Sequence, residues 1–274
     1  MSGGAETSPI DPRSADCGSA RDADPREYAA RLAAAVTAVI GRQLVAAYLH
    51  GSAALGGWVA SRSDVDVLFV VADDMTDAAI AAIPDVLAQA AACPGRSLEY
   101  SVVTRSQAAR PAPPWPFVLH AGFGHGGPGL VTGRSMTGDS DLLMHYAVIR
   151  SAGIVLAGPP PETVIGPVSR PVILAYLADE LAWGLANAPE CYAVLNACRA
   201  LVYLEEDRIV SKVAGGLAEL QRGSGPAAMI RRALDQQQGR EPERKPGADA
   251  VVFASHVAAA LNDAAAGDRA APPS

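Results

Sequence analysis

The sequence predicts an α+β/all-α two-domain chain, with an α/β N-terminal half followed by an all-helical C-terminal half. Three observations support this fold class. Short apolar or β-branched runs alternate with helix-forming runs in the first part of the chain. From Val172 onward the apolar residues recur at helical spacing without a further strand pattern. Between the two parts, Gly158 to Pro171 is rich in proline and glycine, as is typical of a linker.

The N-terminal half begins with a helix and contains three predicted strands. Tyr28 to Ile40 is rich in helix formers and amphipathic, which predicts a helix. Leu44 to Leu49 is a short apolar run that ends at a glycine and a serine, which predicts a buried strand entering a turn. Asp64 to Val71 is β-branched and Leu98 to Thr104 alternates, so both predict strands. The Ala-rich run from Asp77 to Ala92 predicts the helix between them.

The segment from Pro111 to Gly138 contains so many prolines and glycines that no long regular element is expected there. His120 and His125 lie in it without a third ligand, so it is interpreted as a flexible lid rather than a zinc site. The helices expected beyond it are Asp139–Val155, Val172–Leu204 with a break near Asn187–Pro189, Ser211–Leu220, Pro226–Gln238 and Ala248–Ala265. The predicted domains are residues 27–165 and 166–265, between disordered tails at 1–26 and 266–274.

The composition excludes several classes of protein. The 274 residues are 50% hydrophobic, which is enough for a sizeable core, and 22 basic against 29 acidic residues give a net charge of −7. This acidic balance argues against a nucleic-acid binder and favours cationic partners. Four scattered cysteines predict no disulfide framework. No uninterrupted apolar run is long enough to span a membrane, and the first 26 residues lack a signal-like core, so we expect a cytoplasmic protein. A monomer is also expected.

The residues that point to chemistry lie between His50 and Glu99. Gly51-Ser52 opens a turn after a strand, where backbone N–H groups and a hydroxyl can hold a phosphate. Asp64 and Asp66 are two residues apart on a strand, so both side chains share a face, and a divalent cation would neutralise their repulsion. Glu99 on another strand can add a third carboxylate. Taken singly, Asp64 could cap a turn and Asp66 could face solvent; the combination is more specific.

These segments resemble a known family. LHGSAALGGWVASRSDVDVLFVV and LEYSVVT are similar to the catalytic strands of the nucleotidyltransferase superfamily, and more closely to those of the aminoglycoside adenylyltransferases that modify streptomycin and spectinomycin. YAVLNACRALVYLEEDRIVSK, residues 192–212, resembles the C-terminal helix pair of that family. The resemblance implies a polymerase-β-like nucleotidyltransferase domain, with a mixed sheet and flanking helices, followed by a C-terminal helical bundle.

The resemblance also implies roles for individual residues. Asp64 and Asp66 would bind two magnesium ions, and Glu99 would be the general base that takes a proton from the acceptor hydroxyl. ATP, the co-substrate, would be contacted by residues from both halves: Gly51, Ser52, Ser63, Asp141, Arg199 and Lys212. The implied reaction is transfer of AMP from ATP to a hydroxyl of an aminoglycoside-type antibiotic, with release of pyrophosphate.

The acceptor is expected to be cationic, and Glu180, Trp183 and Glu190 are the candidates to bind it beside Glu99. An aromatic residue at such a position is more often part of a core, so core packing is the alternative for Trp183. The relatives place a tryptophan in the region of Pro111 to Gly138, but there this chain has Phe123 and two histidines. Two other functions therefore stay open: transfer to another small-molecule or protein acceptor, and non-catalytic nucleotide sensing.

Overall fold

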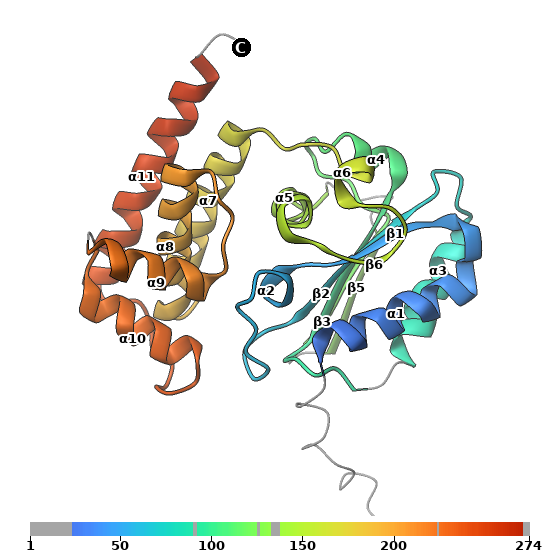
Figure 1. Cartoon of the computed structure of the whole chain (residues 1–274), viewed down its shortest axis with the longest axis horizontal. Helices are drawn as coiled ribbons and strands as arrows, with labels where there is room; N and C mark the ends of the chain where they lie inside the picture. The colour runs from blue at the N-terminus through green and yellow to red at the C-terminus, as the bar shows by residue number, and fades with distance from the viewer. Residues whose placement is uncertain (1–23, 90–91, 125–126, 133–137, 224, 271–274) are drawn as a thin grey trace, which may run out of the picture.

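The computed structural model describes residues 24–89, 92–124, 127–132, 138–223 and 225–270. It consists of a six-stranded mixed sheet with helices on both faces, followed by a group of helices (Figure 1). The first part contains α1 (Pro25–Ile40), η1 (Gly41–Gln43), β1 (Leu44–Leu49), α2 (Gly51–Ala54), β2 (Val65–Val71), α3 (Asp77–Ala88), β3 (Leu98–Thr104), α4 (Arg105–Ala109), β4 (Leu119–Gly124), β5 (Gly127–Thr132), α5 (Leu142–Ala152), β6 (Ile154–Ala157) and α6 (Pro161–Val164). The second contains α7 (Arg170–Asn187), α8 (Glu190–Glu206), α9 (Lys212–Arg222), α10 (Ala227–Gln237) and α11 (Ala248–Ala270).

The strands lie in the order β5-β4-β3-β2-β1-β6. β2 and β3 are parallel, and the other neighbouring pairs are antiparallel. The three strands predicted from the sequence are confirmed, although β2 begins at Val65, one residue after the predicted start. The register places Asp66 beside Glu99, and Glu99 in turn beside Gly122.

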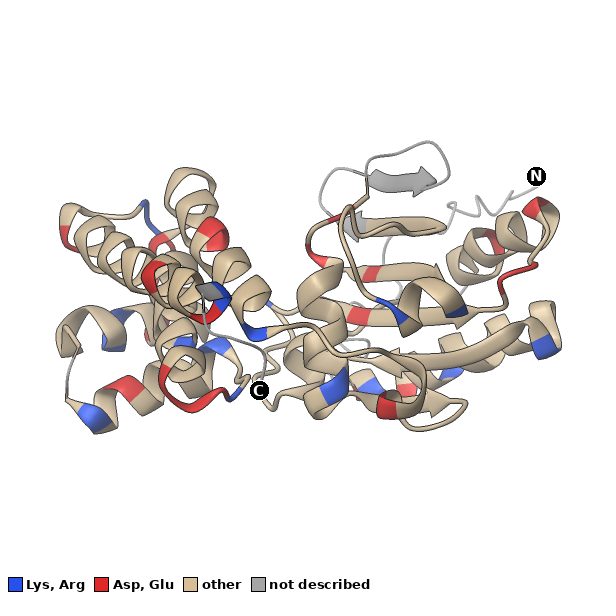
Figure 2. Cartoon of the chain, turned by 90° about the horizontal axis from the view of Figure 1, so that it is seen from above, with Lys and Arg blue, Asp and Glu red and all other residues tan. Residues whose placement is uncertain are grey.

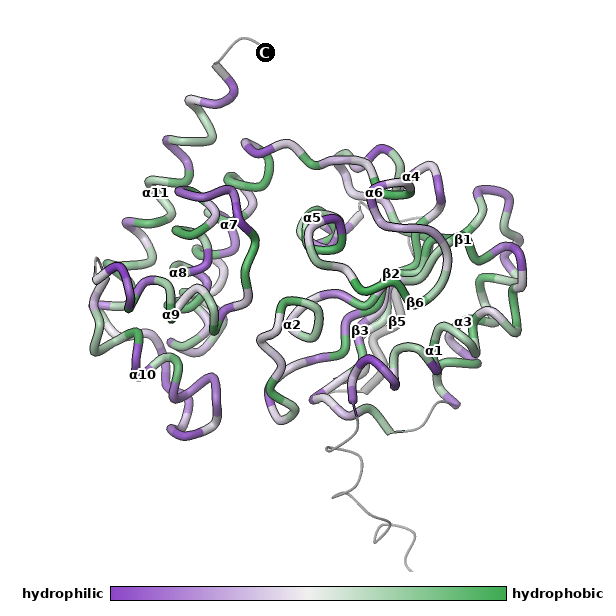
Figure 3. The backbone as a smooth tube through the Cα atoms, in the orientation of Figure 1, coloured by the Kyte–Doolittle hydropathy of each residue, from purple (hydrophilic) through white to green (hydrophobic). Residues whose placement is uncertain are grey.

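The two faces of the sheet are covered differently because side chains alternate along each strand. On one face Val65, Val67 and Phe69 are buried in a cluster with α1 and α3. The opposite face carries Leu68 and packs against α5. Figure 3 shows the hydrophobic colour concentrated on the central strands, with hydrophilic residues on the outer turns. Asp66 and Glu99 therefore lie on the largely apolar face of the sheet that looks toward α5 and the helices beyond it.

Several expectations for this half are wrong. The Gly-rich segment from Pro111 to Gly138 contains a hairpin, β4 and β5, because backbone pairing with β3 outweighs the low strand propensity of glycine. His125 and residues 133–137 of that segment lie outside the described residues. The expected helix up to Val155 ends at Ala152, and the next residues form the edge strand β6. α3 ends at Ala88 rather than Ala92.

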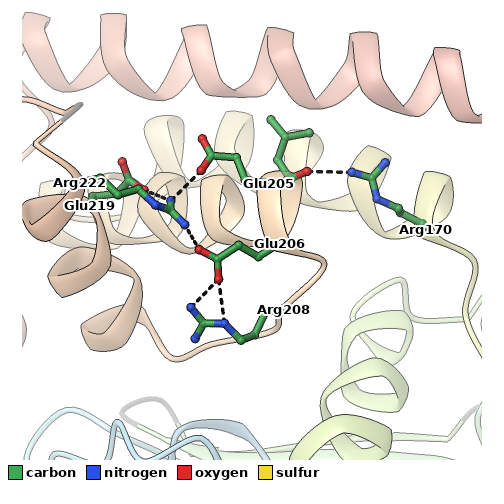
Figure 4. A network of polar contacts seen from close by, with 7 residues as sticks. Arg170, Glu205, Glu206, Arg208, Glu219 and Arg222 are labelled. Atoms are coloured by element: carbon green, nitrogen blue, oxygen red, sulfur yellow. Dashed lines mark hydrogen bonds and ion pairs between the residues drawn. The ribbon is translucent and has the colours of Figure 1, made fainter.

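The helical half follows its predicted pattern, with α7 and α8 separated near Pro189. Arg170, at the start of α7, donates to the Leu204 carbonyl at 2.8 Å and also pairs with Asp207 and Asp268. Figure 4 shows a second group beside it, in which Arg222 contacts carboxylates of α8 and α9. These ion pairs tie the ends of α7, α8, α9 and α11 together. The predicted tail is wrong for residues 266–270, which continue α11.

Among the described residues, one helix is long and apolar enough by length and composition to cross a membrane, Ala248–Arg269 of α11. One side of this helix is buried against α7 and α8, through Ala254, Val257 and Leu261. The same buried cluster continues through α7 and α5 to the second face of the sheet. α11 is therefore a packed helix of the fold, and the two halves share one apolar cluster.

Candidate active site

A sharp turn at the end of β1 begins the site. Gly51 adopts a left-handed backbone conformation, with φ of 61°, as the chain enters α2. A Cβ atom at Gly51 would lie 1.8 Å from Oδ2 of Asp66. The backbone N–H of His50 also donates to the Asp66 carbonyl at 2.9 Å. Only glycine fits this turn, because the turn packs directly against the Asp66 carboxylate.

We expect Gly51→Ala to displace Asp66 and to abolish any activity that depends on it. The left-handed backbone alone would cost about 1–2 kcal/mol, and the steric clash would add to this cost. Gly56→Ala is the matched control, since Gly56 also has a positive φ but nothing lies within 4 Å of the position that its Cβ would take. Thermal denaturation and an activity assay of both variants would test this. Equal stability losses with activity retained in both would contradict it.

Three carboxylates gather on the face of the sheet toward α5. Asp66 on β2 and Glu99 on β3 are neighbours in the parallel register, and Asp64 immediately precedes β2. Figure 2 shows acidic residues at the ends of the central strands nearest the helical half. The predicted convergence of the two aspartates and the glutamate thus follows from the pairing of β2 with β3.

The three carboxylates repel one another, and the neighbouring cations do not fully neutralise them. Burial raises the pKa of Asp66 well above its ordinary value, and the carboxylates of Glu99 and Asp64 raise it further. Burial also raises the pKa of Glu99; the His145 ring opposes this shift, and Asp64 adds to it. Oxygen donors that are buried and crowded with like charge suit a hard divalent cation.

Asp64 differs from Asp66 because it already has partners. Arg96 contacts both of its oxygens, with Nη2 2.6 Å from Oδ2 and Nε 3.2 Å from Oδ1, and the Ser97 hydroxyl donates to Oδ1. Within the described part of the chain, no three His, Cys, Asp or Glu residues are already arranged to hold a metal ion. Arg96, which the sequence did not single out, therefore neutralises Asp64 in the absence of a metal ion.

A cleft of about 540 Å³ runs over these carboxylates and is lined by both halves of the chain. The sheet half contributes Gly51, Ser52, Ser63, Asp64, Asp66, Arg96, Glu99, Asp141 and His145. The helical half contributes Tyr176, Glu180, Trp183, Tyr192, Arg199 and Lys212. All predicted site residues except Glu190 therefore line one cavity.

Several polar atoms in this cleft are buried without a hydrogen-bond partner in the described structure, namely Ser52 Oγ, His145 Nδ1 and Arg199 Nε. Buried polar atoms are normally satisfied, so these three side chains of the cleft lining are ones whose hydrogen-bonding capacity the described residues do not fill. Ser63 behaves differently, because its hydroxyl accepts from the Val59 N–H at 3.0 Å and so shapes the loop before β2. Asp141 accepts a hydrogen bond from the Tyr176 hydroxyl at 2.9 Å.

Lys212 enters the cleft from the first turn of α9. Ser211 caps this helix by accepting from the Ala214 N–H at 3.1 Å. The ammonium group lies 4.5 Å from the centre of the Tyr192 ring. Burial and the Arg199 charge lower the pKa of Lys212 to about 8. A bound anion would favour the charged form, so this lysine fits a phosphate-binding role.

Trp183 is half exposed in the cleft rather than packed in the core, with 53% of its surface accessible. Its ring meets the Tyr192 ring edge-on, at 5.8 Å between centroids. The Tyr192 hydroxyl donates to Glu180, which also lines the cleft. An aromatic surface beside a carboxylate suits a cationic organic ligand.

The expectation that Glu190 binds the acceptor is wrong. Its side chain is 1% exposed and pairs with Arg244 at 2.7 Å and Arg232 at 3.0 Å. Its remaining oxygen accepts from the Gly247 N–H at 3.2 Å. Glu190 therefore joins α8 to α10 and to the segment before α11, and it does not line the cleft.

Two histidines that the sequence analysis did not single out as site residues lie beside the carboxylates. The rings of His50 and His145 are 4.6 Å apart. Burial lowers the pKa of His50 well below its ordinary value, with His145 adding to the effect. The position of His50 directly before Gly51-Ser52 is the one signal that could have identified it. His145 lies within an ordinary helical pattern and gave none.

Comparison with known proteins agrees with this arrangement. Residues 164–260 match the family model of the aminoglycoside adenylyltransferase C-terminal domain. The whole fold is similar to the crystal structure of spectinomycin adenyltransferase AAD(9) from Enterococcus faecialis with ATP and spectinomycin, at a TM-score of 0.58 and 16% identity. That similarity covers 86% of this chain and 98% of the other. No curated protein sequence matches significantly.

Proposed function

We propose that the chain transfers AMP from ATP to a hydroxyl of a cationic, aminoglycoside-type molecule, on the premise that residues 164–260 match the C-terminal domain of the aminoglycoside adenylyltransferases. The predicted family resemblance is confirmed for residues 164–260, and the similar fold supports an enzyme of the nucleotidyltransferase type. One observation carries the proposal: a single cleft joins Asp66 and Glu99 of the sheet to Lys212 of the helical half. The ATP and spectinomycin in the similar AAD(9) structure support it.

In the proposed reaction, the acceptor oxygen attacks the α-phosphorus of ATP, and the bond to the bridging oxygen of pyrophosphate breaks. Glu99 takes the proton of the hydroxyl, for which its raised pKa suits it. Ser52, Arg199 and Lys212, which line the cleft, would hold the phosphate groups. Such a transfer depends mainly on positioning and charge neutralisation.

The proposed metal ligands are Asp64 and Asp66, and they fit magnesium by their oxygen donors and by the excess negative charge around Asp66. The family resemblance suggests two ions. Bound magnesium would neutralise the triphosphate and the leaving pyrophosphate. In such a site Asp64 would share its oxygens with Arg96, which contacts both of them.

The proposed acceptor site lies on the helical wall of the cleft. Trp183 offers an exposed aromatic surface there, and Glu180 supplies negative charge. A carboxylate-lined cavity attracts polycations over neutral sugars. We therefore expect acceptors with amino or guanidino groups to react and neutral analogues to react poorly.

The pKa of Lys212 makes ATP binding dependent on pH. Lysine is charged below its pKa, so the free enzyme presents a cation to the phosphates below pH 8 and loses it above. We expect ATP affinity to fall about tenfold between pH 7 and pH 9, if binding restores an ordinary lysine pKa. Calorimetric titration of ATP across this range would measure it. Lys212→Met should bind weakly but with a flat pH profile, and an equally steep profile in this variant would contradict the assignment.

The function is tested by incubating the purified protein with labelled ATP, magnesium and a panel of acceptors. The panel contains streptomycin, spectinomycin, other aminoglycosides and a neutral trisaccharide, with Asp66→Asn as the inactive control. AMP-modified product and equimolar pyrophosphate with a cationic acceptor would support the proposal. ATP binding without pyrophosphate release from any acceptor would favour a nucleotide sensor. Transfer to a different acceptor class would overturn the substrate assignment. Growth of a sensitive host expressing the gene on each antibiotic gives an independent readout.

A further inference from the structure

His120 on β4 lies behind Glu99, outside the residues that line the cleft. The antiparallel register places His120 opposite Ser101 of β3, two residues from Glu99 on the same face of the sheet. The Ser101 hydroxyl is buried and lies 3.0 Å from His120 Nδ1. We take the serine as the donor of this hydrogen bond, which leaves Nε2 as the ring nitrogen able to donate.

Nε2 of His120 faces Glu99, at 3.9 Å from Oε1. Phe117 packs edge-on against the ring at 6.2 Å between centroids, whereas Asp139 Oδ2 lies 4.0 Å from Nδ1, too far for a hydrogen bond. The imidazole is therefore supported by Ser101 and Phe117. Its remaining polar atom is directed at the carboxylate.

The residue directly opposite Glu99 on β4 is Gly122, and nothing lies within 4 Å of where its Cβ would be. Gly122 therefore gives Glu99 no side-chain support. On the other flank lies Asp66, whose like charge repels Glu99. Of the neighbours that the register gives Glu99 on β4, His120 is the one that offers a hydrogen-bond donor.

We infer that His120 is a positioning residue that holds the Glu99 carboxylate in the orientation needed to take the acceptor proton, and that Ser101 fixes the ring for this task. The inference rests on the proposed function for the role of Glu99. The separation of 3.9 Å is longer than a hydrogen bond, and such contacts tighten when substrates bind. Misplacing a catalytic group by about 1 Å costs up to about a hundredfold in rate.

Kinetics of His120→Ala and His120→Gln test the inference. We expect His120→Ala to lower kcat about 10- to 100-fold, with the KM for ATP unchanged within about twofold. His120→Gln should recover most of the rate, because its amide can also donate to Glu99. His256→Ala, which removes an exposed histidine on α11, is the matched control and should be unaffected. In a Glu99→Gln background, His120→Ala should cause no further loss. A full loss in that background, or a raised KM for ATP with unchanged kcat, would overturn the inference.

A second measurement does not depend on activity. The imidazole NMR signals of His120 are recorded for the wild type and for Glu99→Gln without ATP or metal. We expect the His120 signals to shift in Glu99→Gln while those of His256 stay in place. Unshifted His120 signals would overturn the inference. A wild-type protein that transfers AMP to no acceptor would instead overturn the proposed function, and the spectra alone would then decide whether His120 contacts Glu99.

Discussion

Asp66→Asn is expected to lower AMP transfer by about 10³-fold or more and at the same time to stabilise the ligand-free protein. Activity falls because an amide is a poor magnesium ligand. Stability rises because the folded protein raises the pKa of Asp66, so ionising this carboxylate opposes folding. Asp66 causes no loss of stability below its unfolded pKa, near 3.8, where it is protonated in both states. The stability of the folded protein then falls as the pH rises toward the higher folded pKa.

Thermal denaturation of both proteins between pH 4 and pH 8, without ATP or metal, measures this effect. The wild type should lose stability relative to Asp66→Asn as the pH rises. Asp64→Asn is the matched comparison: it should also lose activity, but it should be destabilised because it breaks the ion pair with Arg96. Wild-type turnover by Asp66→Asn would overturn the proposed metal site, and a lower melting temperature would overturn the electrostatic argument.

Glu99→Gln is expected to bind ATP normally and to transfer AMP about 10²- to 10⁴-fold more slowly, because glutamine cannot accept the proton of the acceptor hydroxyl. A general base works only when deprotonated. The wild-type kcat should therefore rise with pH through the raised pKa of Glu99, and this dependence should disappear in the variant. Single-turnover rates and ATP titrations across pH separate the two effects.

Glu162→Gln, an exposed substitution on α6, provides the control for the loss of one negative charge. It should leave both the rate and the pH profile unchanged. A Glu99→Gln protein with near-normal turnover would show that another group accepts the proton. His145 would then be the next candidate, since it lines the same cleft and its Nδ1 is unpartnered in the described structure.

The centre of the site could be predicted from the sequence because its geometry follows from local pattern. A strand that opens with two alternating aspartates, and a second strand with a glutamate near its start, place their carboxylates together once the strands pair in register. The turn at Gly51 could be predicted in the same way. These features depend on neighbouring residues and on one pairing between strands.

The sequence predictions failed where the environment of a residue depends on residues far away in the chain. Glu190 has the composition expected of an acceptor ligand, but arginines 42 and 54 residues further along the chain bury it. The glycines of β4 and β5 carry little strand propensity, and only pairing with β3 makes them strands. His120 became informative only when the register placed it beside Ser101 and near Glu99.

The apolar cluster shared by the sheet half and the helical half limits which recombinants of this gene can fold. Met144 of α5, in the sheet half, lines a small cavity with Leu177 and Tyr203 of the helical half. Recombination near residue 165 would pair an α5 with helices that were not selected to fit it. We expect chimaeras joined there to fold poorly, and those that exchange α5 together with the helical half to fare better. New acceptor specificity is therefore more readily reached by point substitutions in the cleft than by exchange of halves.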